Sequence, residues 1–114
     1  MDTTTGLCCI RSVATRNGVT FHVDGELDLA TAPLLAAALD AVNEVDCVVL
    51  DIAGLTFCDG AGLRVLELTR RRLGERFHVR GASPLVLRIA GIVGMTWVAE
   101  GGRAPESRYG DQPT

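Results

Sequence analysis

The sequence contains no lysine. The 11 basic residues among its 114 are all arginines, and 14 acidic residues give a formal net charge of −3. A mildly acidic chain has no electrostatic attraction for nucleic acid or for an anionic membrane surface. We therefore expect no nucleic-acid partner and no site that depends on a lysine amine.

Long hydrophobic runs are also missing, although 47% of the residues are hydrophobic. No segment reaches the roughly 20 apolar residues of a membrane helix, and the N-terminus lacks the apolar core of a secretory signal. We therefore expect a cytoplasmic protein without membrane insertion. The length fits one small domain, predicted at residues 1–100, and a disordered tail is predicted at residues 101–114 because large apolar residues are scarce there.

The cysteines lack the spacing of a metal site. Cys8, Cys9, Cys47 and Cys58 form no CxxC pair, so we expect neither a metal ion nor another cofactor. In a reducing cytoplasm free thiols packed as small hydrophobic groups are expected. The alternative is a redox role for Cys47 and Cys58, since Cys58 adjoins Asp59 and Cys47 opens the strand before it.

Hydrophobic periodicity predicts alternating strands and helices. Thr31, Asp59 and Ser83 each precede an apolar stripe of helical period and are expected to be helix N-caps. The segment GLTFCD before the second helix is expected to be a loop. The expected strands are residues 7–14, 19–25, 46–52, 77–81 and 96–100. This order predicts an α/β sandwich whose mixed sheet of about five strands starts with an antiparallel hairpin.

Several polar and aromatic residues are expected to be structural. His22 and His78 alternate with apolar residues in strands and are predicted to be solvated. The arginine run at residues 70–72 is predicted to be a solvated helix end, where cations are favourable. Its alternative is a docking patch for an acidic partner. Trp97 is predicted to lie in the core.

The segment VVLDIAGLTFCDGAGLRVLELTRRR, residues 48–72, has a strand, an acidic loop and a helix start in succession. One interpretation is a phosphate-accepting receiver domain with Asp51 as the acceptor. That chemistry needs Mg²⁺ and further carboxylates, but the first expected strand, LCCIRSVA, contains no acid. Receiver domains also use a lysine, and the chain has none, so this interpretation is the least favoured.

A second interpretation rests on three segments in order: GELDLATAPLL, VVLDIAGLTFCDGAGLRVL and VRGASPLVLRIAGIVGM. With these, residues 7–99 resemble the STAS domain (sulfate transporter and anti-sigma factor antagonist), specifically the free-standing bacterial antagonists of anti-sigma factors. The resemblance implies a STAS-like α/β fold and a non-enzymatic protein, a monomer or weak homodimer. STAS domains also serve as subunits of stress-sensing and lipid-transport ABC assemblies, and this remains the alternative.

The resemblance implies a docking switch. Such an antagonist binds an anti-sigma factor with a histidine-kinase-like ATPase fold and so regulates sigma-factor-dependent transcription. The partner inactivates it by phosphorylating a Ser or Thr directly after an aspartate at the start of the second helix. A helix N-terminus tolerates phosphate, whereas the same dianion inside an interface weakens docking through desolvation and repulsion.

Transferred to this chain, the motif aspartate is Asp59 and the phospho-acceptor position is Gly60, which has no hydroxyl. The resemblance assigns partner binding to this helix start and to the loop after the hairpin: Asp28, Thr31, Asp59, Gly60, Ala61, Gly62 and Leu63. Asp28 is equally well explained as a turn-forming residue. The nearest hydroxyl is Thr56, in the expected loop. The protein is therefore either permanently competent to bind or controlled elsewhere.

Overall fold

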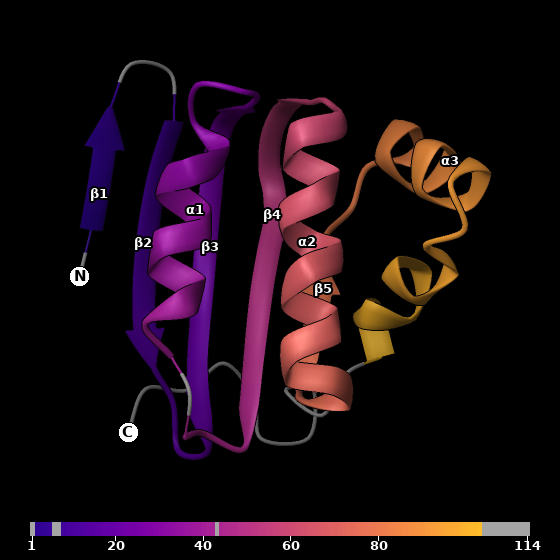
Figure 1. Ribbon diagram of the computed structural model, residues 1–114. Helices are drawn as coiled ribbons and strands as arrows, with labels where there is room; N and C mark the ends of the chain where they lie inside the picture. The colour runs from indigo at the N-terminus through magenta and orange to yellow at the C-terminus, as the bar shows by residue number, and fades with distance from the viewer. Residues whose placement is uncertain (1, 6–7, 43, 104–114) are drawn as a thin grey trace.

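A computed structural model describes residues 2–5, 8–42 and 44–103. One five-stranded sheet forms its centre, and its strands lie in chain order from β1 to β5 (Figure 1). The strands from β1 to β3 pair antiparallel, and β3, β4 and β5 pair parallel. The predicted mixed sheet with an antiparallel start is confirmed. The strands are β1 (Asp2–Thr5), β2 (Cys8–Ala14), β3 (Gly18–Leu27), β4 (Cys47–Cys58) and β5 (Phe77–Arg80).

Two helices connect the parallel strands and cover one face of the sheet. Figure 1 shows α1 and α2 side by side over this face, with α3 and η2 beyond the β5 edge. The helices are α1 (Ala32–Asp40), α2 (Gly60–Leu73), α3 (Pro84–Ile92) and the 3₁₀ turns η1 (Gly74–Arg76) and η2 (Thr96–Arg103). The predicted cap Ser83 is confirmed, because its Oγ accepts from Val86 N at 3.2 Å.

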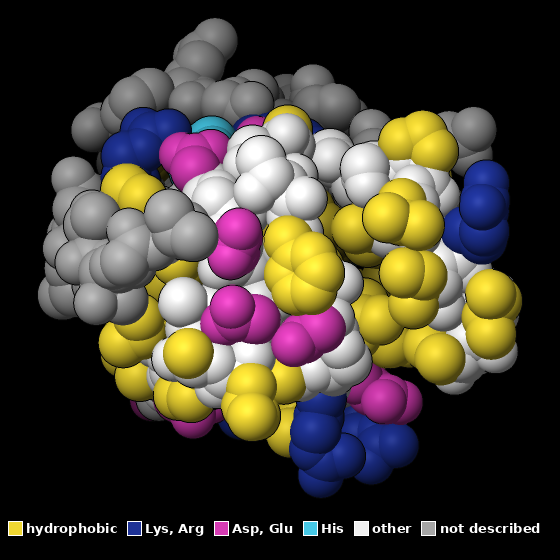
Figure 2. Space-filling model, turned by 90° about the horizontal axis from the view of Figure 1, so that it is seen from above, with side chains coloured by type: hydrophobic (Ala, Val, Ile, Leu, Met, Phe, Trp, Pro, Cys, Tyr) yellow, Lys and Arg dark blue, Asp and Glu magenta, His cyan; other side chains and the backbone are white. Residues whose placement is uncertain are grey.

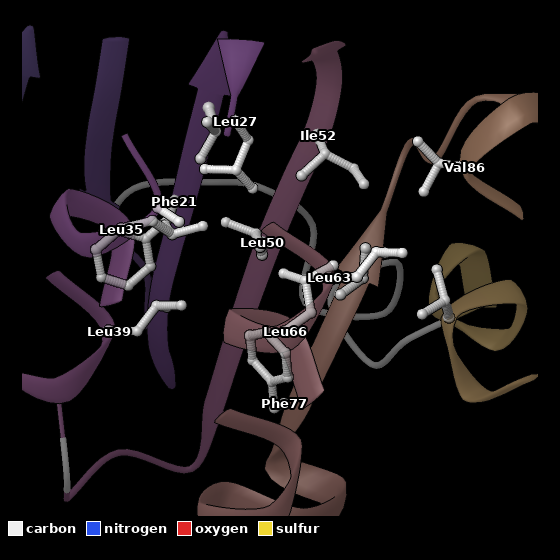
Figure 3. Packing of buried hydrophobic residues seen from close by; sticks show 14 of the residues in the cluster. Phe21, Leu27, Leu35, Leu39, Leu50, Ile52, Leu63, Leu66, Phe77 and Val86 are labelled. Carbon is white, nitrogen blue, oxygen red and sulfur yellow. The ribbon is translucent and has the colours of Figure 1, made fainter. Parts of the chain in front are cut away.

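The core lies between the sheet and the two covering helices. Side chains from α1 and α2 point toward the central strands in Figure 3. Burying these aliphatic and aromatic groups supplies the main driving force for folding. The largest fully buried side chains are Phe77, Leu27, Leu35, Leu39, Leu50, Ile52, Leu66, Val23, Val48, Val49 and Val79.

The loop predicted over GLTFCD is wrong, because β4 continues to Cys58. Gly54 does not break the strand, since it serves a close approach: a Cβ there would lie 1.7 Å from Asp24 Oδ1. Phe57 then pairs with Glu26 after two register shifts, and such bulges let the strands continue to pair. Thr56 therefore lies in a strand, and the neighbouring β3 is also longer than predicted.

The strand predicted at residues 96–100 is wrong as well. Met95 and Val98 are both buried, a spacing of three that suits the 3₁₀ helix η2. Trp97 packs against the core as predicted, with its ring 5.8 Å from that of Phe77.

The strand β1 was not predicted. Residues 101–103 of the predicted tail belong to η2, and residues 104–114 lie outside the described part.

The arginine run is solvated at Arg71 and Arg72, as predicted, but it also makes hydrogen bonds within the protein. Arg70 Nη1 donates to Phe77 O at 2.8 Å, and Arg72 Nη2 donates to Leu39 O at 2.6 Å. Two of the three guanidinium groups therefore tie α2 to its neighbours. Arg71 and Arg72 stay exposed, and a docking patch for an acidic partner at this run stays a prediction.

Candidate functional site

The parallel pairing of β3 and β4 brings two helix starts to one end of the sheet. Leu27 and Cys58, the last residues of these strands, are register partners. Asp59 N donates to Leu27 O at 3.1 Å, which fixes the second loop to the first. The predicted residues of the loop before α1 and of the start of α2 therefore lie at one end of the sheet.

Asp59 caps α2 as predicted. Its backbone is extended, with φ −107° and ψ −170°, and its Oδ1 accepts from Ala61 N at 2.9 Å and from Gly62 N at 3.2 Å. These two N–H groups have no partner within the helix, so the carboxylate satisfies them. The cap fixes the direction of the helix start relative to the sheet.

Gly60 is the first residue of α2, and its position is exposed. A Cβ built there meets nothing within 4 Å, and its φ lies outside the left-handed region. Neither packing nor backbone conformation therefore requires glycine at this position. A serine side chain fits the space, at a helix N-terminus whose dipole favours an anion.

Gly62 and Leu63 are buried, which corrects the expectation that they contact a partner directly. A Cβ at Gly62 would lie 2.8 Å from Cys58 Sγ and 2.9 Å from Leu27 Cδ2. Leu63 is only 7% exposed and belongs to the core. These residues hold the helix start against the sheet, while Ala61 is half-buried and Gly60 remains accessible.

Asp28 organises the loop before α1. Its Oδ1 accepts from Ala30 N and from Thr31 N, both at 3.0 Å. The backbone N–H of Thr31 lowers the pKa of the Asp28 carboxyl, so it stays ionised. Thr31 is the N-cap residue of α1 as predicted, but its side chain makes no capping hydrogen bond, because its hydroxyl turns back and donates to Glu26 O at 2.8 Å. Asp28 is thus a turn residue at the same end of the sheet as Gly60.

The two cysteines with a predicted redox role cannot bond to each other. Cys47 begins β4 and Cys58 ends it, which separates them by about 35 Å of extended chain. Burial, followed by the charge of Asp59, raises the pKa of the Cys58 thiol to about 11. A thiol that stays protonated is a poor redox nucleophile. A redox role of either cysteine with another thiol stays a prediction.

Asp51 lies within β4 and not at its end. Its Oδ2 accepts from Arg80 Nη2 at 3.0 Å and lies 3.5 Å from His22 Nδ1. The carboxylate of Asp51 therefore forms an ion pair with Arg80. His22 lies beside the same carboxylate and is not simply solvated. Among the residues that the structure describes, no group of three or more His, Cys, Asp and Glu could hold a metal ion.

Exposed apolar side chains lie at this end of the sheet, and the sequence did not predict them. Phe57 is 50% exposed, Leu85 60% and Leu29 79%. Figure 2 looks down on this end of the molecule and shows hydrophobic side chains beside acidic ones. The signal in the sequence is an aromatic residue two positions before the cap Asp59, in a segment predicted to be a loop.

Comparison with known proteins identifies the family of the chain. The sequence model of a family described as "Mlab, STAS domain" matches residues 10–98. The chain belongs to this STAS domain family. The structure confirms the α/β fold that the resemblance implied. In the described part of the STAS domain, every helix is too short or too polar to cross a membrane.

Three similar proteins are described as anti-sigma factor antagonists. The anti-sigma-F factor antagonist RsfB of Mycobacterium tuberculosis is 33% identical over 67 residues, 56% of this chain and 55% of RsfB. The chain thus spans about half the length of the curated relative. A crystal structure of an anti-sigma factor antagonist from Mycobacterium paratuberculosis has a TM-score of 0.69 and 28% identity, covering 75% of this chain and 77% of that one. A Rhodobacter sphaeroides antisigma-factor antagonist STAS domain has a TM-score of 0.57 and 25% identity, covering 68% and 90%.

Proposed function

We propose that this protein is an anti-sigma factor antagonist that stays permanently competent to bind. It docks on an anti-sigma factor with a histidine-kinase-like ATPase fold and so regulates sigma-factor-dependent transcription. The descriptions of RsfB and of the two solved relatives support the antagonist role. The docking surface is the end of the sheet where β3 and β4 lead into α1 and α2.

The observation that carries the proposal is Gly60. The capped helix start, the outward position and the open space for a side chain are all present, and only the hydroxyl is absent. A partner that phosphorylates this position therefore has nothing to modify. Since the backbone does not require glycine, a serine there is expected to make the site modifiable.

Thr56 does not replace the missing hydroxyl at the helix start. It lies in β4 three residues before Asp59, and its Oγ1 donates to Gly25 O at 3.2 Å. Phosphorylation there would remove this hydrogen bond between β3 and β4. Control through Thr56 would therefore need a different mechanism from a phosphate at a helix N-terminus.

The location of the docking surface is tested with Gly60→Glu. A carboxylate at this exposed position partly mimics a phosphate, although it carries about one charge instead of the ~1.5 to 2 of a phosphate. Affinity for the purified anti-sigma-F factor of M. tuberculosis is measured by calorimetry, with RsfB as positive control. We expect the wild type to bind and Gly60→Glu to bind at least about 10-fold more weakly, about 1.4 kcal/mol.

Gly91→Glu is the matched control for this experiment. Gly91 is also an exposed helical glycine whose Cβ would meet nothing within 4 Å, but it lies at the far end of α3. It is expected to leave the affinity unchanged. Equal affinities of Gly60→Glu and the wild type would move the docking surface away from this helix start. A wild type that fails to bind under conditions where RsfB binds would contradict the antagonist function.

A second candidate function is a STAS subunit of a larger stress-sensing or lipid-transport assembly. It is favoured by the description of the matched family model, which names Mlab and not an antagonist. Such a subunit needs no phosphate switch, in agreement with Gly60. Co-purification with a permease and an ATPase, instead of an anti-sigma factor, would identify it.

A further inference from the structure

The end of the sheet carries a groove between β4 and α3. Its floor and walls are mostly apolar, and its volume is about 170 Å³. Phe57 and Leu85 stand at its sides and are 50% and 60% exposed. The lining residues are Leu55, Thr56, Phe57, Cys58, Ser83, Leu85, Val86 and Ile89.

The groove is continuous with the helix start at Gly60. Cys58, one of its lining residues, directly precedes the cap Asp59. A protein that covers position 60 therefore reaches the groove with neighbouring side chains. An exposed aromatic residue in a recess is the kind of group that contributes most to a protein interface.

The strand side of the groove is acidic, whereas its α3 side carries one exposed arginine, Arg88. The two chain stretches that form this end of the sheet, residues 24–31 and 55–63, contain four carboxylates and no arginine: Asp24, Glu26, Asp28 and Asp59. Glu26 is the direct cross-strand partner of Phe57. Figure 2 shows acidic side chains next to the hydrophobic ones, with arginines toward the margins of the view.

We propose that the groove receives an apolar side chain projecting from a basic surface of the partner protein. This inference rests on the proposed antagonist function and names the chemistry of its docking contact. The carboxylates attract and orient the basic surface of the partner. The apolar contact in the groove slows dissociation of the complex. Phe57 and Leu85 are the anchors on this side.

A second copy of the chain is the wrong occupant on electrostatic grounds. Two copies that met through this surface would bring their carboxylate clusters together. Like charges facing each other across an interface cost free energy. A partner with arginine or lysine around its apolar group has no such cost.

The test truncates the anchors one at a time. Phe57→Ala and Leu85→Ala are compared with Leu68→Ala, which removes a similarly exposed leucine (46%) from the outer side of α2. Calorimetry with the anti-sigma-F factor of M. tuberculosis measures the affinities. We expect the first two variants to raise Kd at least about 10-fold and Leu68→Ala to change it less than about 2-fold. Circular dichroism and thermal unfolding confirm that the three variants are folded.

Charge is tested separately. Raising the salt concentration from about 0.05 to 0.5 M shortens the Debye length and is expected to weaken binding of the wild type. Glu26→Gln is expected to weaken binding and to reduce this salt dependence. Affinity that is independent of salt would overturn the basic character of the partner surface.

The outcomes separate this inference from the proposed function. A wild type that binds as tightly as its Phe57→Ala and Leu85→Ala variants overturns the groove contact but keeps the antagonist. A wild type that does not bind, where RsfB does, overturns both. Sedimentation that shows a dimer abolished by Phe57→Ala would make a second copy the occupant and also overturn the inference.

Discussion

Gly60 and Gly62 lie two residues apart and lack a side chain for different reasons. At Gly62 a Cβ would collide with Cys58 Sγ and Leu27 Cδ2, both less than 3 Å away. At Gly60 a Cβ meets nothing within 4 Å. Packing therefore explains the glycine at position 62. Packing does not explain the glycine at position 60. Replacing Gly62 or Leu63 therefore probes the core, and only changes at Gly60 probe the exposed helix start.

This contrast predicts opposite stability effects of two alanine substitutions. Gly62→Ala is expected to lower the free energy of unfolding by about 1 to 3 kcal/mol, because the methyl group overpacks the contact between α2 and the sheet. Gly60→Ala is expected to be neutral or to stabilise by up to about 1 kcal/mol, since alanine restricts the unfolded chain. Urea unfolding measures both values. Similar effects at the two positions would contradict the difference in packing.

Individual elements differ in how far the sequence predicts them. The capped start of α2 was predictable, because Asp59 followed by an apolar stripe is a local signal. The full length of β4 was not, because its last residues are held by pairing with β3 across two register shifts. The 3₁₀ helix η2 was not predictable either, because its buried positions are defined by packing on β5. Tertiary contacts overrode local preference in both cases.

At the level of one helix, α1 leaves space beneath it. An open, mainly apolar hollow of about 370 Å³ lies between part of α1 and the strands β2 and β3, and alanines form much of the helix side of it. Ala38→Leu is expected to fill part of this space and to stabilise the protein by about 1 kcal/mol, or about 4 to 8 °C in Tm. Thermal unfolding measures the shift. A lower Tm would mean that the helix already packs as closely as the sheet allows.

For the whole molecule, topology decides where the proposed docking surface lies. Parallel pairing of β3, β4 and β5 places the starts of α1 and α2 at the same end of the sheet, so Asp28 and Gly60 could be assigned to one surface from the sequence. The groove could not be predicted, because it forms only where α3, more than 20 residues further along the chain, packs near the end of β4. The burial of Leu63 likewise depends on how α2 packs on the sheet.

The central claim is that the proposed antagonist cannot be switched off at residue 60. Its most direct test mixes the wild type or Gly60→Ser with the anti-sigma-F factor of M. tuberculosis and radiolabelled ATP, and follows complex and phosphate incorporation over time. The account predicts a wild-type complex that persists without label, and a Gly60→Ser complex that becomes labelled at residue 60 and dissociates. A wild type that is labelled, at Thr56 or elsewhere, and released would contradict it.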